Sequence, residues 1–201
     1  MSNYNNYIHA KHDSDFNGIL HNYKDIYSLK VSSIGYNNPL RPSYLIDNIT
    51  DQVYVDWCSI NKLYEYVQID FKKPYTFTPA SYSFAVRDPN GYSPYNPLNW
   101  TVQGLIGQNW KNISEVRNSP FASIKSKTFT IDNYTEYLNS IRFMQISPNL
   151  LASEKDGLYI FCLAEIELFG IIRKGYCYIS LNSGCFLPIH FLSLIGIFIV
   201  L

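Results

Sequence analysis

Apolar and polar residues alternate in short segments along most of the chain. Within residues 26–34, Tyr27, Leu29 and Val31 are separated by polar side chains. Alternation with a period of two predicts a β-strand with one buried and one exposed face. The same pattern predicts further strands at residues 67–71, 81–86, 100–105, 110–116, 125–131, 141–146 and 164–170.

Segments rich in Gly, Pro and Asn separate these predicted strands. The longest, residues 87–99, contains Pro89, Pro94 and Pro97, so we expect a long loop there. No window shows a sustained hydrophobic period of 3.6 residues, which would indicate helices. The pattern therefore predicts an all-β fold, an antiparallel β-sandwich forming one domain. Turn-like composition also marks residues 35–42, 107–109, 118–120 and 132–139.

The charge balance disfavours nucleic acid as a partner. Lys plus Arg and Asp plus Glu each number 16 in 201 residues, so the formal net charge is zero. Proteins that bind nucleic acids rely on an excess of positive charge. The 18 Tyr and 12 Phe also favour strands over helices.

Candidate catalytic groups do not converge in the sequence. His9, His12 and His21 precede the first predicted strand, and His190 lies near the C-terminus. The sequence has no Gly-rich phosphate loop, no Gly-x-Ser-x-Gly and no His-Glu-x-x-His. Acid–base and nucleophilic catalysis need such groups close together. We therefore expect a protein that is not an enzyme and has no cofactor, apart from a candidate calcium site considered below.

The N-terminal residues indicate a cytosolic location. The first thirty residues contain no apolar run of the kind that a secretory signal requires. In a reducing compartment, cysteines usually remain free and behave as small buried hydrophobic residues. We expect this state for Cys58, Cys162, Cys177 and Cys185, which show no metal-binding spacing.

The chain ends in an apolar tail, residues 173–201. Residues 179–201 are uncharged and long enough to cross a bilayer as a helix. Arg173 and Lys174 precede them, which predicts a tail anchor with the domain on the cytosolic side. The alternative is an apolar segment packed against the domain.

The first residues of the chain show no regular alternation of hydrophobic and polar residues. Residues 1–24 are polar, and we interpret them as a lead-in with one short helix near residues 16–21. The domain itself is then predicted to occupy residues 25–172.

A set of short motifs follows in order between residues 26 and 170. Single motifs are weak, but their order is specific, and together they resemble a discoidin domain, also called the coagulation factor 5/8 type C domain. The phrase Phe16-Asn17-Gly18-Ile19-Leu20-His21 is similar to one in divergent intracellular members from protists. The motifs are Leu45-Ile46-Asp47-Asn48, Trp57-Cys58-Ser59, Tyr66-Val67-Gln68-Ile69-Asp70-Phe71, Asn99-Trp100-Thr101-Val102-Gln103-Gly104, Gly107-Gln108-Asn109-Trp110, Ile141-Arg142-Phe143 and Ala164-Glu165-Ile166-Glu167-Leu168-Phe169-Gly170.

The resemblance implies an eight-stranded jelly-roll sandwich of the galactose-binding-like superfamily. It also implies that loops at one end of the sandwich bind a ligand without catalysis, typically a glycan or a lipid head group. A glycan or a protein is the ligand class that we expect. Two other hypotheses remain: a tail-anchored membrane adaptor whose loops bind nothing specific, and a module that targets a partner enzyme to its substrate.

Residues 87–99 are the best candidate for a ligand-binding loop. Tyr92 and Tyr95 offer flat apolar faces, Arg87 offers a charge, and Asn96 offers paired hydrogen-bond groups. In the alternative interpretation, the prolines stiffen an ordinary loop whose tyrosines pack on the sandwich.

A second candidate loop, residues 148–157, contains Asn149 and Leu150. In membrane-binding members of the family, exposed apolar side chains in such a loop insert into lipid. The alternative is that the leucines of this loop point inward.

Some discoidin domains hold a structural calcium ion near the Asp-Asn motif. The resemblance places a candidate calcium site here at Asp47, Asn48 and Asp51, with Glu165 as a more distant carboxylate. Oxygen ligands of these types suit calcium. The same residues also fit an ordinary Asx turn without metal.

Other residues of the motifs have structural interpretations. Trp57, Trp100 and Trp110 are predicted to pack between two sheets. Arg142 is predicted to pair with Asp70 or Glu165.

Overall fold

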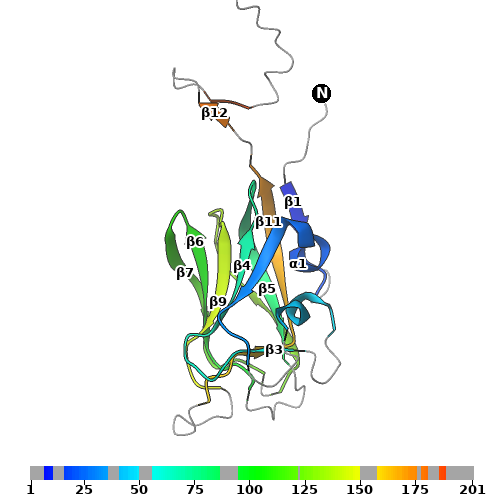
Figure 1. Cartoon of the computed structure of the whole chain (residues 1–201), viewed down its shortest axis with the longest axis vertical. Coiled ribbons are helices and arrows are strands. Elements are labelled where there is room, and N and C mark those ends of the chain that lie inside the picture. The colour runs from blue at the N-terminus through cyan, green and yellow to red at the C-terminus, as the bar shows by residue number, and fades with distance from the viewer. Residues whose placement is uncertain are drawn as a thin grey trace, which may run out of the picture.

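Two antiparallel β-sheets face each other in the computed structural model (Figure 1). The structure describes residues 7–10, 16–35, 41–49, 56–86, 95–121, 123–149, 158–175, 178–180 and 186–188. In spatial order, the four-stranded sheet is β1 (Tyr7–Ala10), β11 (Glu165–Lys174), β5 (Tyr75–Ala85) and β8 (Ser126–Thr130). The five-stranded sheet is β2 (Tyr27–Val31), β4 (Tyr66–Phe71), β9 (Ser140–Gln145), β6 (Trp100–Ile106) and β7 (Asn109–Val116).

Short elements complete the described chain. A two-stranded pair, β3 (Trp57–Cys58) with β10 (Cys162–Leu163), lies at one end of the sandwich (Figure 1). The helical elements are α1 (Ile19–Asn22) and the 3-10 helices η1 (Lys24–Ile26) and η2 (Pro42–Ile46). The remaining strands are β12 (Tyr178–Ser180) and β13 (Phe186–Pro188).

Burial in the strands follows the alternation in the sequence. In β4, Val67, Ile69 and Phe71 are buried, and the residues between them are partly exposed. The all-β sandwich predicted from the sequence is therefore confirmed. Its two sheets hold four and five strands among the described residues, one more than the eight that the resemblance implies.

Aromatic side chains fill the space between the sheets. Trp100 is fully buried, and its ring centroid lies 5.3 Å from that of Phe84. Its indole nitrogen donates a hydrogen bond to the hydroxyl of Tyr82 at 2.9 Å. Trp57 is also fully buried and donates to the carbonyl of Ser33 at 3.0 Å. Both indoles are core residues, as predicted, and each has the partner that a buried N–H requires.

Two described segments of the predicted lead-in, residues 7–10 and 19–22, belong to the sandwich, which corrects their interpretation as a lead-in. β1 pairs with β11 along its whole length, and α1 packs against the same strand (Figure 1). Ile19 and Leu20 of α1 are completely buried. The short helix predicted near residues 16–21 overlaps α1, but four residues are too few to show a hydrophobic period, so its burial was not predicted from the sequence.

The central strand β5 begins earlier than predicted. It extends from Tyr75 because it pairs with β11 as far as Lys174. Pro79 lies within it, opposite Gly170, where the register shifts at a bulge. Proline has no N–H to donate to a sheet, so a bulge at this place is expected. That proline also obscured the strand in the sequence.

The predicted tail contains extended segments. β12 and β13 pair in antiparallel register. Across the described parts of the chain, no helix has both the length and the apolar character needed to cross a membrane. The structure therefore has strands at residues 178–180 and 186–188, where a membrane-spanning helix over residues 179–201 was predicted. Membrane anchoring itself stays a prediction.

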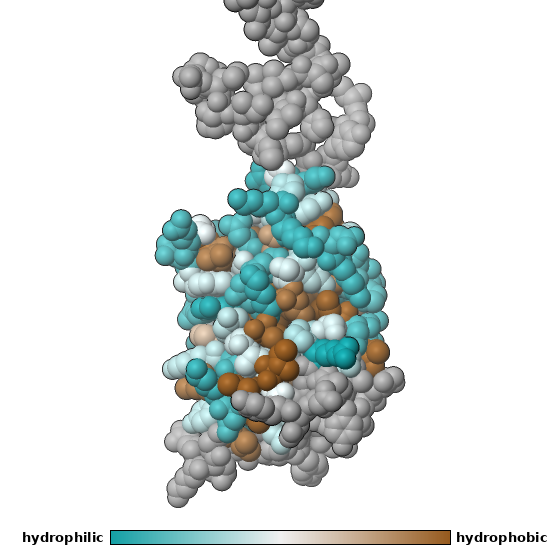
Figure 2. Space-filling view, in the orientation of Figure 1, coloured by the Kyte–Doolittle hydropathy of each residue, from teal (hydrophilic) through white to brown (hydrophobic). Residues whose placement is uncertain are grey.

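Hydrophilic side chains cover most of the face shown in Figure 2, and hydrophobic side chains gather in one patch low on that face. The patch lies toward the end of the sandwich that carries β3 (Figures 1 and 2). Ile34, which follows β2, is one of the large hydrophobic residues that the structure leaves exposed. The patch is therefore less polar than the rest of the coloured surface in this view.

Candidate functional site

The end of the sandwich that carries the candidate loops is defined by strand register. β6 begins at Trp100 opposite Gln145, where β9 ends. β5 ends at Ala85, opposite Ser126 of β8 and Glu165 of β11. The segments before β6, β8 and β11 and after β5 and β9 therefore meet at one end. We call this the loop end; its described residues are 95–99, 117–121, 123–125, 146–149 and 158–164.

Two of the predicted ligand-binding residues are buried within the loop end. Asn149 is fully buried; its amide donates to the carbonyl of Ile160 at 2.7 Å and accepts from Gln145 at 2.9 Å. Asn96 is also buried, and its amide donates to the carbonyl of Phe121 at 3.0 Å. These amides bind the protein's own chain, so their placement corrects the expectation that they face a ligand. They hold the loops in position.

The structure describes only one of the other predicted loop residues. Tyr95 is half-buried just before β6. Arg87, Tyr92 and Leu150 lie outside the described residues. Tyr95 is thus the one predicted contact residue that the structure places at the loop end with part of its side chain open to solvent.

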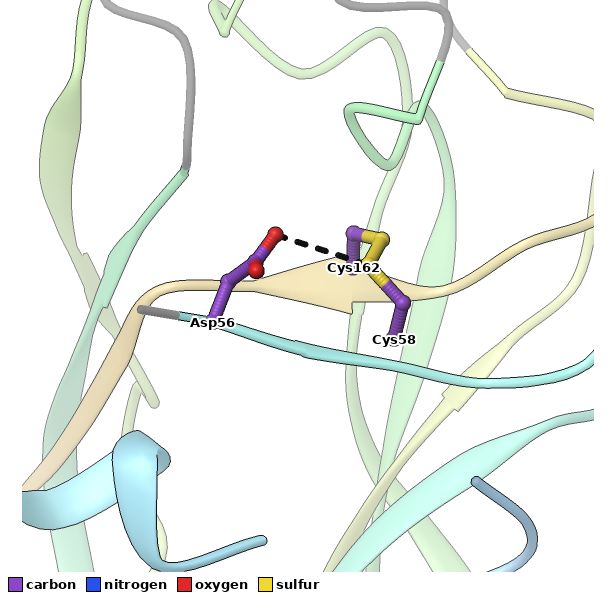
Figure 3. Close-up of side chains that lie close together, drawn as sticks. All are labelled: Asp56, Cys58 and Cys162. Atoms are coloured by element: carbon purple, nitrogen blue, oxygen red, sulfur yellow. Dashed lines mark hydrogen bonds between the residues drawn. A yellow bond between two sulfur atoms is a disulfide. The ribbon is translucent and has the colours of Figure 1, made fainter. Parts of the chain in front are cut away.

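A disulfide at the loop end corrects the expectation of free cysteines. Cys58 and Cys162 lie directly opposite each other in the β3–β10 pair, with their Cα atoms 4.1 Å apart, and their sulfur atoms are bonded (Figure 3). Two strands of two residues each leave no pattern in a sequence, so this contact could not be predicted. Cys177 and Cys185 lie outside the described residues.

Asp56 points toward this disulfide (Figure 3). It is fully buried, and its Oδ2 lies 3.5 Å from the sulfur of Cys58. Asp56, Cys58 and Cys162 are the one group among the described residues whose ligand atoms are spaced to hold a metal ion. Metal binding requires thiolates, however, and the disulfide uses both sulfur atoms. The arrangement is therefore that of a structural cross-link.

The candidate calcium residues form an Asx turn beside a buried carboxylate. Asp47 accepts a hydrogen bond from the backbone N–H of Ile49 at 3.0 Å, and Asn48 has a φ of 65°. The backbone N–H of Asn48 donates to Glu165 at 2.8 Å. The structure therefore contains the ordinary Asx turn that these residues can form without a metal ion. Asp51 lies outside the described residues, and calcium binding stays a prediction.

Glu165 is a buried carboxyl group with an unusual charge state. Burial raises its pKa to about 9, and the nearby carboxylates of Asp47 and Glu167 add to this effect. Backbone hydrogen bonds from Asn48 and Ile49 act in the opposite direction but are weaker. The group is therefore protonated at neutral pH in the absence of a cation. The carboxyl oxygens of Glu165 and Asp47 have the chemistry that calcium prefers.

Glu167 anchors the N-terminal helix. Its side chain accepts from the backbone N–H groups of Leu20 at 2.6 Å and His21 at 3.1 Å. Gly18 makes this approach possible, because a Cβ there would lie 2.7 Å from the side chain of Glu167. Burial raises the pKa of Glu167, although these hydrogen bonds lower it. The alternation of apolar and polar residues in β11 correctly predicted that Glu165 and Glu167 face away from the core. It did not show that η2 and α1 cover these two side chains.

Trp110 and Arg142 lie on the outer face of the five-stranded sheet, which corrects two expectations. Trp110 is half-buried rather than part of the core. The guanidinium carbon of Arg142 lies 4.2 Å from the ring centroid of Trp110 and 5.5 Å from that of Tyr66. Arg142 therefore pairs with aromatic rings, and neither Asp70 nor Glu165 is its partner. The sequence does not distinguish a tryptophan that stacks on an arginine from a tryptophan in the core.

Asp70 is paired with a residue that the sequence did not indicate. Its carboxylate lies 2.6 Å from the ammonium group of Lys30 on the neighbouring strand. Burial by itself raises the pKa of Asp70, but hydrogen bonds from Lys30, Ser140 and Gln68 outweigh it and lower the pKa.

Comparison with sequences finds no relative: no family model matches the chain, and no curated protein does. Comparison with solved structures does find similar folds. The module CpGH89CBM32-5 from Clostridium perfringens, solved in complex with GalNAc-beta-1,3-galactose, has a TM-score of 0.53 at 16% identity, with 72% of this chain and 95% of that chain covered.

Two Streptococcus pneumoniae structures are similar to the same degree. The family 32 carbohydrate-binding module of EndoD has a TM-score of 0.53 at 12% identity, covering 71% of this chain and 96% of that one. A fucose binding module has a TM-score of 0.52 at 16% identity, covering 71% and 90%. The chain therefore has the discoidin-like, galactose-binding-like β-sandwich fold of the family 32 carbohydrate-binding modules.

Proposed function

We propose that the chain is a non-catalytic recognition module that binds a glycan at its loop end. The observation that carries this proposal is the match in fold to solved carbohydrate-binding modules over nearly their whole length. Two of those structures are described by their sugar ligands, GalNAc-beta-1,3-galactose and fucose. At such low identity the fold alone is shared, so the ligand has to be argued from this chain's own residues.

The loop end has the rigidity that a recognition site needs. The Cys58–Cys162 disulfide and the buried amides of Asn96 and Asn149 tie its segments together. A site that is ordered before binding loses less conformational entropy when a ligand arrives. Tyr95 is half-buried at this end, and an aromatic side chain is well suited to the apolar face of a sugar.

The two large acidic residues of β11 do not suggest hydrolysis. Glu165 and Glu167 are both buried, and both accept hydrogen bonds from backbone N–H groups. A pair of carboxyl groups that hydrolyses glycosides must reach the substrate from either side of the scissile bond. These two groups serve instead to attach η2 and α1 to the sheet.

A glycan array probed with the full chain tests this proposal. We expect binding to one class of sugar, weakened by about 1 kcal/mol or more in Tyr95→Ala. Tyr137→Ala is the matched control, because Tyr137 is an exposed tyrosine that precedes β9 and so lies at the opposite end of the sandwich. An array without signal, or equal losses in both variants, contradicts glycan binding at the loop end.

A further inference from the structure

A row of polar side chains crosses the outer face of the five-stranded sheet. Strand register places its members directly opposite one another from β2 to β7. Neighbouring strands lie about 4.8 Å apart, so the row extends over roughly 19 Å. We call it the polar row; its members are Lys30, Gln68, Arg142, Gln103 and Asn112.

Arg142 lies at the centre of the polar row and is held in one orientation. The rings of Trp110 and Tyr66 flank its guanidinium group. Its Nε donates a hydrogen bond to the side-chain oxygen of Gln103 at 2.6 Å, and Gln103 in turn donates to Asn112 at 2.7 Å. The Nε is thereby used, whereas the two terminal amino groups have no hydrogen-bond partner among the described residues.

The charge of Arg142 is not balanced by a neighbour. Asp70, the carboxylate of the adjoining strand, is bound by Lys30 at 2.6 Å and by Gln68 at 2.6 Å. Within the described ranges, no acidic side chain forms an ion pair with Arg142. Guanidinium groups bind carboxylates with two parallel hydrogen bonds when their geometry is fixed. An oriented, unpaired guanidinium on an outer face is thus complementary to a carboxylate from another molecule.

Groups on either side of Arg142 can bind hydroxyl groups. Asn112 is exposed, and its amide nitrogen has no described partner. Gln68 donates its amide to Asp70, which leaves its side-chain oxygen able to accept. An acceptor therefore lies on the strand next to Arg142, and a donor lies two strands away on its other side, where sugar hydroxyls can use both.

We propose that the polar row is a second binding site, separate from the loop end, for a saccharide that carries a carboxylate. The terminal amino groups of Arg142 donate to the carboxylate, and Asn112 and Gln68 bind hydroxyl groups beside it. An extended peptide is a poorer fit, because peptides that add to sheets bind through the main chain of an edge strand. The polar row lies on the face of the sheet and offers side chains only.

Calorimetric titration of the full chain with trigalacturonic acid and with its methyl ester tests the proposal. Esterification removes the negative charge of each carboxyl group and places a methyl group on one of its oxygens, so we expect the ester to bind at least about tenfold more weakly. Gln103→Glu is the decisive variant. It places a carboxylate beside Arg142 without removing the stacked guanidinium, and we expect the acid to bind at least about tenfold more weakly to it.

Three control variants distinguish binding at the polar row from binding elsewhere on the chain. Arg142→Lys keeps the charge but loses the paired donors, and we expect an intermediate loss of affinity. Lys111→Gln removes a positive charge from the same strand as Asn112, and Tyr95→Ala changes the loop end. Neither Lys111→Gln nor Tyr95→Ala is expected to alter the binding of the acid.

Several results overturn the proposal. They are no binding of the acid at millimolar concentration, equal binding of acid and ester, unchanged affinity in Gln103→Glu, and a loss in Tyr95→Ala equal to that in Gln103→Glu. Competition by acetate as strong as by the sugar also overturns it, since the site then recognises any anion. Gln103→Glu tests the polar row and Tyr95→Ala tests the loop end, each with its own sugar, so the two proposals can fail independently.

Discussion

The carboxyl group of Glu165 accepts a hydrogen bond from the backbone N–H of Asn48 at 2.8 Å, although the two residues are 117 positions apart in the sequence. Through this bond, the first residue of β11 holds the Asp-Asn turn that follows η2. Glu165 is almost fully buried, and burial raises its pKa to about 9. The link between turn and sheet therefore depends on a group whose protonation differs between the folded and unfolded chain.

The unfolding free energy should fall as the pH rises from about 5 to 9. The folded chain retains a proton on Glu165 that the unfolded chain releases near its ordinary pKa of 4.5, so the stabilisation is complete below that pH and is lost as the pH approaches 9. The slope for this one group is at most about 1.4 kcal/mol per pH unit. Urea unfolding at several pH values measures it.

Glu165→Gln should flatten this pH dependence, because the amide keeps the shape and the acceptor oxygen but does not titrate. Glu136→Gln, at an exposed position, is the control and should keep the slope of the natural sequence. A Glu165→Gln protein whose stability changes with pH as the natural chain's does argues against the assignment.

Reduction of the Cys58–Cys162 disulfide should destabilise the fold by about 2–5 kcal/mol, because the bond closes a long loop in the unfolded chain. Urea unfolding with and without dithiothreitol measures the difference. The Cys58→Ala/Cys162→Ala double variant should be weakened to a similar extent and should not respond to the reductant. An unfolding midpoint that dithiothreitol leaves unchanged in the natural chain rules out the bond.

Tyr82→Phe should cost about 1–3 kcal/mol, because it leaves the buried indole N–H of Trp100 without an acceptor. Tyr134→Phe is the matched comparison. The hydroxyl of Tyr134 is buried without a hydrogen-bond partner in the described structure, so its removal should be neutral or slightly stabilising. Equal losses in the two variants would show that the Tyr82–Trp100 hydrogen bond contributes little.

Calcium should raise the melting temperature if the candidate site at Asp47, Asn48 and Asp51 binds the ion, since a ligand that binds only the folded state stabilises it. The comparison is a thermal melt with millimolar calcium, with magnesium, and with a chelator. Asp47→Asn should abolish any increase. Identical melting temperatures in calcium and chelator exclude the site.

Local pattern explains which parts of the fold could be predicted. The alternation of Val67, Ile69 and Phe71 with polar residues determines which face of β4 is buried, and this is a property of neighbouring residues. The pair of β3 and β10 is different, because its strands have two residues each. Their pairing depends on the surrounding fold, so the disulfide between them was not predicted.

Among the site residues, too, local pattern predicts some features, and others depend on the surrounding fold. The sequence placed Tyr95 in a candidate ligand-binding loop, where its role stays a prediction, but it did not show that the amides of Asn96 and Asn149 turn inward. For Arg142, the partner is set by cross-strand register, which brings it to Trp110 and Gln103. Register joins positions about 30 to 40 residues apart here, and an alternation pattern carries no information on such pairs.

The covalent link between Cys58 and Cys162 has a consequence for limited proteolysis. A protease that cuts the backbone once anywhere between these positions yields two fragments that remain one molecule until a reductant is added. The nicked protein would migrate as a single band without reductant and as two bands with it.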